Sequence, residues 1–146
     1  MVLTYTLTQD HGYVLAVAIS AIFVTEILGG QVGGARKRAQ VPYPYLYADK
    51  AEAEKDPKKK IFNCYQRAHQ NTLEKLPGFL VLLAGASIEH PYLAAVSGAV
   101  WTVSRIAYAK GYQTGDPAKR QYGAFGYLGY FALLGASIKT AYNLIF

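Results

Sequence analysis

The sequence has little charge, one cysteine and no lysine or arginine before Arg36. Only 16% of its residues are charged, which argues against a soluble domain, where about a quarter usually are. Because Cys64 is the only cysteine, an internal disulfide framework is excluded. A catalytic role for Cys64 is disfavoured, since the sequence shows no obvious base to activate its thiol. A signal peptide is disfavoured because the first residues lack a basic region. No Cys, His and carboxylate residues have metal-ligand spacing, so we expect no metal.

Long apolar stretches predict an all-α membrane protein with four transmembrane helices, in a single domain of residues 1–146. In the second span only residues 76–88 are strongly apolar, and about 13 residues cannot cross a bilayer alone. That helix is therefore predicted to extend back through the polar residues 61–75. The predicted spans are residues 12–34, 61–88, 92–112 and 122–146.

A glycine cluster closes the first span. Gly29, Gly30, Gly33 and Gly34 form two overlapping G-x-x-x-G pairs, which would allow close contact between helices. The same glycines would equally suit a flexible helix end before a loop. Residues 36–60 are predicted to be a polar loop, because the proline-rich residues 42–45 disfavour a helix.

Basic residues flank the apolar spans, which accounts for the net charge of +6 without a nucleic-acid partner. Eight of the fifteen lysines and arginines lie between Arg36 and Lys60, and Lys119 and Arg120 lie in the next basic loop. The positive-inside rule then predicts that both loops are cytoplasmic and that both termini face the other side.

One face of the second span carries polar residues. Arg67, Asn71 and Glu74 occur at i, i+4 and i+7, which places them on one side of a helix. Ionisable groups at membrane depth usually face a protein interior or a wet cavity. This face is either a ligand site or an ion-pair network that only fixes packing.

A second polar stripe lies on the third span, where Arg105, Tyr108 and Tyr112 occur at i, i+3 and i+7. The tyrosines could serve as interfacial anchors, but Arg105 on the same face favours a site. Four helices are too few to cover both stripes and Glu26, so we expect a homo-oligomer with sites between subunits. Guanidinium, phenol, amide and carboxylate groups together suit a ligand with two carboxylates and one amine, such as glutathione.

Two segments are distinctive: residues 62–74 (FNCYQRAHQNTLE) and residues 105–120 (RIAYAKGYQTGDPAKR). Both resemble the family of membrane-associated proteins in eicosanoid and glutathione metabolism (MAPEG), and the resemblance covers nearly the whole chain. It implies a homotrimer that binds glutathione as co-substrate between neighbouring subunits, near the cytoplasmic face, without a metal.

The resemblance also implies roles for individual residues. The thiol-activating position, at the start of the fourth long helix, falls on Arg120, with Lys119 as a rival. Arg120 is preferred because a guanidinium stays charged and is weakly hydrated. Lys75 departs from the pattern, since a relative has a glutathione-contacting tyrosine there. The implied glutathione-binding residues are Arg36, Arg67, His69, Asn71, Glu74, Arg105, Tyr108 and Tyr112.

The implied activity is that of a membrane-bound glutathione transferase and peroxidase. It would conjugate glutathione to lipophilic electrophiles, including leukotriene-C-type conjugation, or reduce lipid hydroperoxides. The implied location is the endoplasmic reticulum, with the mitochondrial outer membrane as an alternative. Two other functions stay open: a non-catalytic lipid-presenting member of the same family, and a small transporter or channel subunit, for which no repeat symmetry is found.

Overall fold

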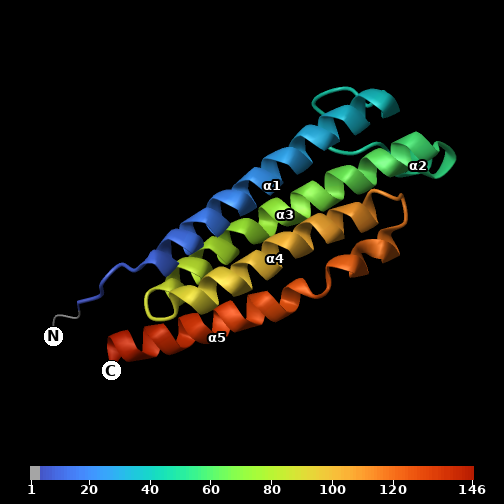
Figure 1. Ribbon diagram of the computed structural model, residues 1–146. Helices are drawn as coiled ribbons and strands as arrows, with labels where there is room; N and C mark the ends of the chain where they lie inside the picture. Colours follow the sequence, from blue (N-terminus) through green and yellow to red (C-terminus); the bar gives the residue numbers. More distant parts are fainter. Residues whose placement is uncertain (1–3) are drawn as a thin grey trace. The chain divides into compact units, whose positions relative to one another are not determined.

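The structure, a computed structural model, describes residues 4–146, and within that range it is helical without a strand (Figure 1). This confirms the predicted all-α fold class. Residues 1–3 of the predicted single domain, residues 1–146, lie outside the described part. The elements are α1 (Gln9–Ala39), α2 (Lys50–Lys55), α3 (Pro57–Ser87), α4 (Pro91–Tyr112), the 3-10 helix η1 (Pro117–Gly123) and α5 (Gly126–Ile145).

Helix α1 extends beyond the predicted span at both ends. It continues through all four clustered glycines to Ala39, so the flexible helix end considered for them is wrong. The basic residues at 36–38 lie in its last turn, where they complement the helix dipole. Gln40 then takes a left-handed φ of 54°, and the amide of Val41 donates to the Arg36 carbonyl at 3.3 Å. This turn, usually formed by glycine, ends the helix.

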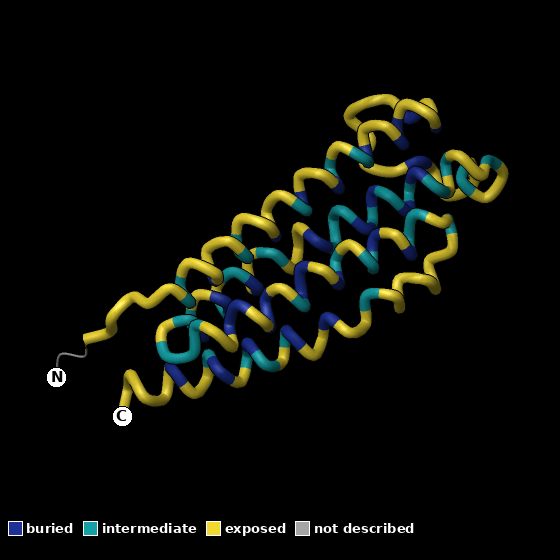
Figure 2. Tube along the Cα trace, viewed as in Figure 1, coloured by how far each residue is buried: buried dark blue, intermediate teal, exposed yellow. Residues whose placement is uncertain are grey.

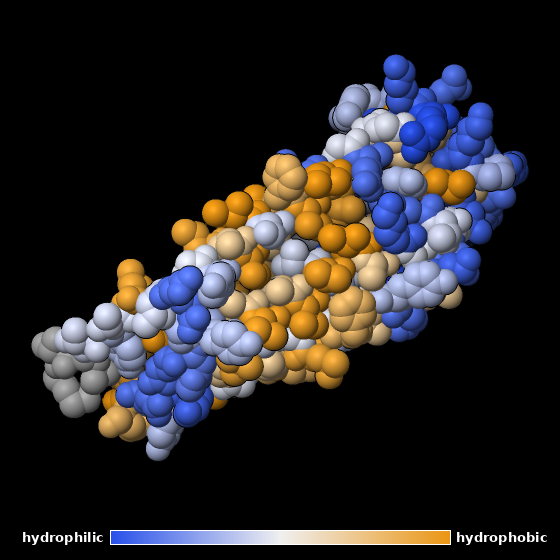
Figure 3. All heavy atoms as spheres, in the orientation of Figure 1, coloured by the Kyte–Doolittle hydropathy of each residue, from blue (hydrophilic) through white to orange (hydrophobic). Residues whose placement is uncertain are grey.

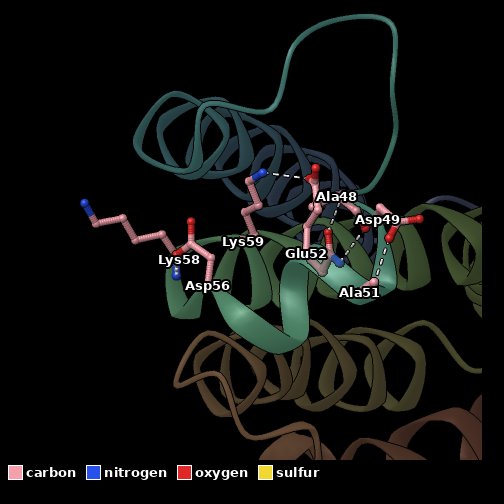
Figure 4. Close-up of polar contacts among 8 residues, drawn as sticks. Ala48, Asp49, Ala51, Glu52, Asp56, Lys58 and Lys59 are labelled. Atoms are coloured by element: carbon pink, nitrogen blue, oxygen red, sulfur yellow. Dashed lines mark hydrogen bonds and ion pairs between the residues drawn. The ribbon is translucent and has the colours of Figure 1, made fainter.

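The polar loop predicted over residues 36–60 is wrong for most of its length, because two helices begin inside it. The Asp49 carboxylate accepts a hydrogen bond from the Ala51 amide at 2.8 Å and caps α2 (Figure 4). Asp56 accepts likewise from the Lys58 amide at 2.8 Å and caps α3. Pro57 suits the first position of α3 because its φ is already helical and no amide hydrogen is needed there.

The later helices follow the predicted spans more closely. Helix α3 includes the polar residues 61–75, as predicted, and a short link through His90 leads to α4. Helix α5 starts at Gly126 rather than at residue 122, because residues 117–123 form η1 instead. Asp116 caps η1 by accepting from the Ala118 amide at 3.0 Å.

The chain forms two compact units. Unit 1 contains the described residues up to Ile22 together with Lys75–Ser104 and Phe125–Phe146. Its core is built around Phe79, whose ring stacks on Trp101 with centroids 3.8 Å apart. Leu83 and Leu133 are fully buried in the same core. Helices α1, α3, α4 and α5 all contribute to this core.

Glycines bring the backbones of α4 and α5 close together within unit 1. A Cβ atom built on Gly129 would overlap the carbonyl oxygen of Ser97, and one on Gly126 would overlap the Ser104 side chain. By contrast, a Cβ on Gly135 meets no atom within 4 Å. The approach of these two helices therefore depends on particular glycines of α5.

Unit 2 contains Phe23–Glu74 and Arg105–Ala124. Phe62 is fully buried in one of its clusters, and the other is formed by Leu28, Ala68 and Ala109. Gly29 also allows a close approach, because a Cβ there would lie 3.2 Å from Nε2 of His69. The glycine cluster therefore supports helix contact at one of its members.

The outer surfaces of the helices are strongly apolar. Leu128, Phe131 and Ile138 of α5 are each more than 60% exposed, and exposed positions recur along α1 and α5 (Figure 2). Figure 3 shows apolar side chains along the helices and polar ones around the α1–α3 connection. Among the described helices, only α1 is long and apolar enough by composition to cross a membrane. That α3, α4 and α5 also cross it stays a prediction.

Candidate functional site

The polar face of α3 holds an ion pair. Nη1 of Arg67 lies 2.9 Å from Oε1 of Glu74, two turns along the helix. The two side chains are 41% and 47% exposed, so both are accessible on the surface of unit 2. An ion pair this exposed contributes less than about 1 kcal/mol to stability. Its weakness argues against a purely structural role and leaves both charges available to a ligand.

Arg105 joins α4 to this region of α3. Its Nη2 donates to Oδ1 of Asn71 at 2.8 Å, and its Nε donates to Oγ1 of Thr72 at 3.3 Å. The guanidinium also lies over the Tyr108 ring, 4.0 Å from its centroid. The two polar stripes identified in the sequence thus meet through one arginine.

The two tyrosines of α4 extend this arrangement. The rings of Tyr108 and Tyr112 lie 5.3 Å apart and are tilted by 58°. Both pack against the cluster of Leu28, Ala68 and Ala109 in unit 2. Tyr108 lies beside Arg105 and Tyr112 lies against Tyr108, so this pair differs from isolated interfacial anchors, which would have no polar partner.

Other predicted site residues have separate surroundings. His69 lies against Gly29 of α1 rather than at the Arg67–Glu74 pair. Arg36 is 7% exposed, and its Nη1 donates to the carbonyls of Val41, Pro42 and Tyr45, the last at 2.7 Å. Its guanidinium therefore holds the chain that follows α1. Ligand roles for Arg36 and His69 stay predictions.

The two candidates for thiol activation lie in η1, so Arg120 precedes the fourth long helix rather than beginning it. Both Lys119 and Arg120 are exposed. Nη1 of Arg120 donates to the Pro117 carbonyl at 3.0 Å. Within residues 4–146, no hydrogen bond or ion pair joins Arg120 to the Arg67–Glu74 pair.

An open cleft of about 400 Å³ lies beside the C-terminal end of α1. Its lining combines backbone of the turn after α1 with basic and aromatic side chains. It is lined by Gly33, Arg36, Lys37, Gln40, Val41, Pro42 and Tyr43. The residues of the Arg67–Glu74 pair do not line it.

Sequence reasoning missed Tyr47 and Gln70. The Tyr47 hydroxyl donates to Oε1 of Gln70, beside Arg67 on α3. Burial raises the pKa of Tyr47 above its ordinary value, although the nearby Arg67 guanidinium acts in the opposite direction. The phenol is therefore neutral at pH 7, and its hydroxyl group can act as a hydrogen-bond donor to Gln70. Gln70, three residues after Arg67, could have been found from helical spacing, whereas Tyr47 lies in an irregular segment.

Within residues 4–146 the protein is therefore helical, and a partly exposed polar face with two arginines joins α3 to α4. The model of the MAPEG family matches residues 14–142, and the chain belongs to this family. Its members are membrane proteins, and they include glutathione transferases and peroxidases alongside members with other functions.

Proposed function

We propose that this chain is a membrane-bound glutathione transferase with glutathione-dependent peroxidase activity, of the microsomal glutathione S-transferase 3 type. The observation that carries the proposal is the contact of Arg105 with Asn71, which unites the polar residues of α3 and α4. Family membership supports glutathione chemistry as the class of reaction.

Glutathione has two carboxylates and one ammonium group, and the polar face offers complementary charges. The Arg67 guanidinium suits a carboxylate, and the Glu74 carboxylate suits the ammonium. Binding would open the Arg67–Glu74 pair, which is weak because it is exposed. The ligand would replace one charge pair with two, and Asn71 and the two tyrosines would supply further hydrogen bonds.

Thiol activation is assigned to Arg120, with Lys119 as the rival. A nearby cation lowers the thiol pKa from about 8.5, so the proton passes to water and a thiolate remains. In conjugation the sulfur forms a bond to an electrophilic carbon, and the leaving group or opened epoxide oxygen takes the displaced electron pair. In peroxide reduction the sulfur attacks the terminal oxygen and the O–O bond breaks, which gives a sulfenic acid and a lipid alkoxide that takes a proton from water to become the alcohol. A second glutathione then forms the disulfide and water.

The working assembly is a homotrimer with its sites between neighbouring subunits. The exposed apolar side chains of the helices suit both lipid contact and subunit contact. The lipophilic acceptor would reach the thiolate from the bilayer, and the basic loops would attract glutathione from the cytoplasm. We propose the endoplasmic reticulum as the location, with the mitochondrial outer membrane as the alternative.

The function is tested with protein purified in detergent. Glutathione-dependent turnover is measured with a model electrophile and with a fatty-acid hydroperoxide side by side, and glutathione binding is measured by equilibrium dialysis. Turnover of either acceptor supports the enzyme and identifies its preferred chemistry. Glutathione binding without turnover, or no binding, would leave the lipid-presenting function instead.

Arg120→Ala separates activation from binding. Turnover should fall by about 100-fold, because one group that stabilises developing charge is typically worth that much. The dissociation constant of glutathione should change by less than about threefold. Lys119→Ala is the matched control on η1, and the ultraviolet absorbance of bound thiolate reports activation directly. Unchanged turnover in Arg120→Ala would refute its role, and a loss in Lys119→Ala instead would transfer the role to the lysine.

A further inference from the structure

The segment between α1 and α2, residues 41–49, forms a strap along unit 2. It has no regular secondary structure, yet it is anchored by hydrogen bonds on both sides of Tyr47. These hydrogen bonds fix the backbone on either side of Tyr47. The strap reaches the polar face of α3 through Tyr47, whose hydroxyl contacts Gln70.

The first anchor is the buried Arg36 guanidinium. It donates to three carbonyl groups of the strap, with the shortest bond, 2.7 Å, to Tyr45. The rings of Tyr43 and Phe62 lie 4.5 and 4.8 Å from its central carbon. Guanidinium suits this position because it can donate to several acceptors while stacking on aromatic rings.

The second anchor is Asn63 of α3, which binds Ala48 at both of its backbone groups. The Ala48 amide donates to Oδ1 of Asn63 at 2.8 Å, and Nδ2 of Asn63 donates to the Ala48 carbonyl at 3.0 Å. This side-chain amide acts as the partner that a neighbouring strand would otherwise provide. Tyr47 thus lies between two fixed points, Tyr45 and Ala48.

At the other end of the Tyr47 side chain, the hydroxyl donates its hydrogen to Gln70. The phenol oxygen retains acceptor capacity. Gln70 follows Arg67 by three residues on α3, so the hydroxyl that binds Gln70 lies on the same helical face as the Arg67 side chain. Arg67 otherwise has Glu74 as its ion-pair partner. If Glu74 turned to a ligand ammonium, the Tyr47 oxygen on the same face would be available to accept from the guanidinium.

We propose that Tyr47 is a positioning residue, which the strap holds against α3 so that Arg67 is oriented for a carboxylate of the ligand. This inference rests on the proposed function, because the ligand is glutathione. It assigns to the strap a role in glutathione affinity rather than in the chemical step. Arg36 and Asn63 then act on the site indirectly, by fixing the backbone on either side of Tyr47.

The direct test is Tyr47→Phe, which removes only the hydroxyl. Tyr45→Phe is the matched control, since Tyr45 contributes its backbone carbonyl to the strap and its side chain is exposed. Tyr47→Phe should raise the KM and Kd for glutathione by about threefold to tenfold, the effect of one lost hydrogen bond near a charge, with kcat at saturation unchanged. Tyr45→Phe should match the wild type.

Asn63→Ala tests whether the strap places Tyr47. It should raise the KM for glutathione in the same direction, and the double variant Tyr47→Phe/Asn63→Ala should be little worse than either single variant. Unchanged affinity in Tyr47→Phe, a fall confined to kcat, or fully additive effects in the double variant would each overturn the inference. If the wild type bound no glutathione, the proposed function itself would fail. If the wild type bound glutathione and Tyr47→Phe bound it equally well, only the role of Tyr47 would fail.

Discussion

Unit 1 buries the stacked rings of Phe79 and Trp101 among closely packed helix backbones, whereas unit 2 buries Phe62 and smaller apolar side chains together with the guanidinium of Arg36. Unit 2 also holds the Arg67–Glu74 pair and the contact of Arg105 with Asn71. The comparison indicates that packing dominates in one unit and polar chemistry in the other. Substitutions in unit 1 should therefore affect stability first, and substitutions on the polar face of unit 2 should affect ligand affinity first.

The largest effect is expected from Phe79→Ala in unit 1. It removes a fully buried ring from its stack on Trp101, which typically costs about 3–5 kcal/mol of unfolding free energy. Unfolding in mixed micelles, followed by circular dichroism, measures the change. Leu128→Ala is the exposed control on α5 and should change little. If both variants unfolded alike, the core assigned to unit 1 would be wrong.

Gly129→Ala should have an intermediate effect. The added methyl group would overlap the Ser97 carbonyl, and relieving such overpacking typically costs about 1–3 kcal/mol. Gly135→Ala, on the same helix, meets no atom and should gain up to about 1 kcal/mol from helix propensity. Thermal unfolding of the two variants should therefore shift in opposite directions, and shifts of equal sign would contradict the close approach of α4 and α5.

Arg105→Lys should have the smallest effect on folding but a clear effect on the ligand. Lysine keeps the charge yet cannot contact Asn71 and Thr72 together in the same geometry. The Kd for glutathione should rise about tenfold, equivalent to about 1.4 kcal/mol, with the unfolding midpoint nearly unchanged. Lys110→Arg, at an exposed position of α4, is the control. A stability loss as large as that of Phe79→Ala would remove the distinction between the units.

Much of the helical fold could be predicted from the sequence, because long apolar stretches identify long helices. Helix α2 and η1 were not predicted, since each is short and begins at an aspartate cap whose bond depends on local geometry. The polar residues 36–38 also continued α1, although their charge suggested a loop. The ends of these helices therefore depend on short-range capping and turn formation, which composition does not reveal.

The candidate site could be predicted only in part. Helical spacing placed Arg67, Asn71 and Glu74 on one face, but it could not say which side chain each would contact. That Arg105 would select Asn71 depends on the relative position of α3 and α4 in unit 2. Tyr47 was missed for the same reason, because its position depends on where the irregular strap returns to α3.

Helix α2 follows the strap and has no buried residue. Its contact with α3 is made by charged groups, the Glu52 carboxylate and the Lys59 ammonium, 2.7 Å apart (Figure 4). Such a segment adds little to either hydrophobic core, so a peptide tag or fluorescent label inserted there would leave both units intact. It offers an attachment point for following the protein in a membrane.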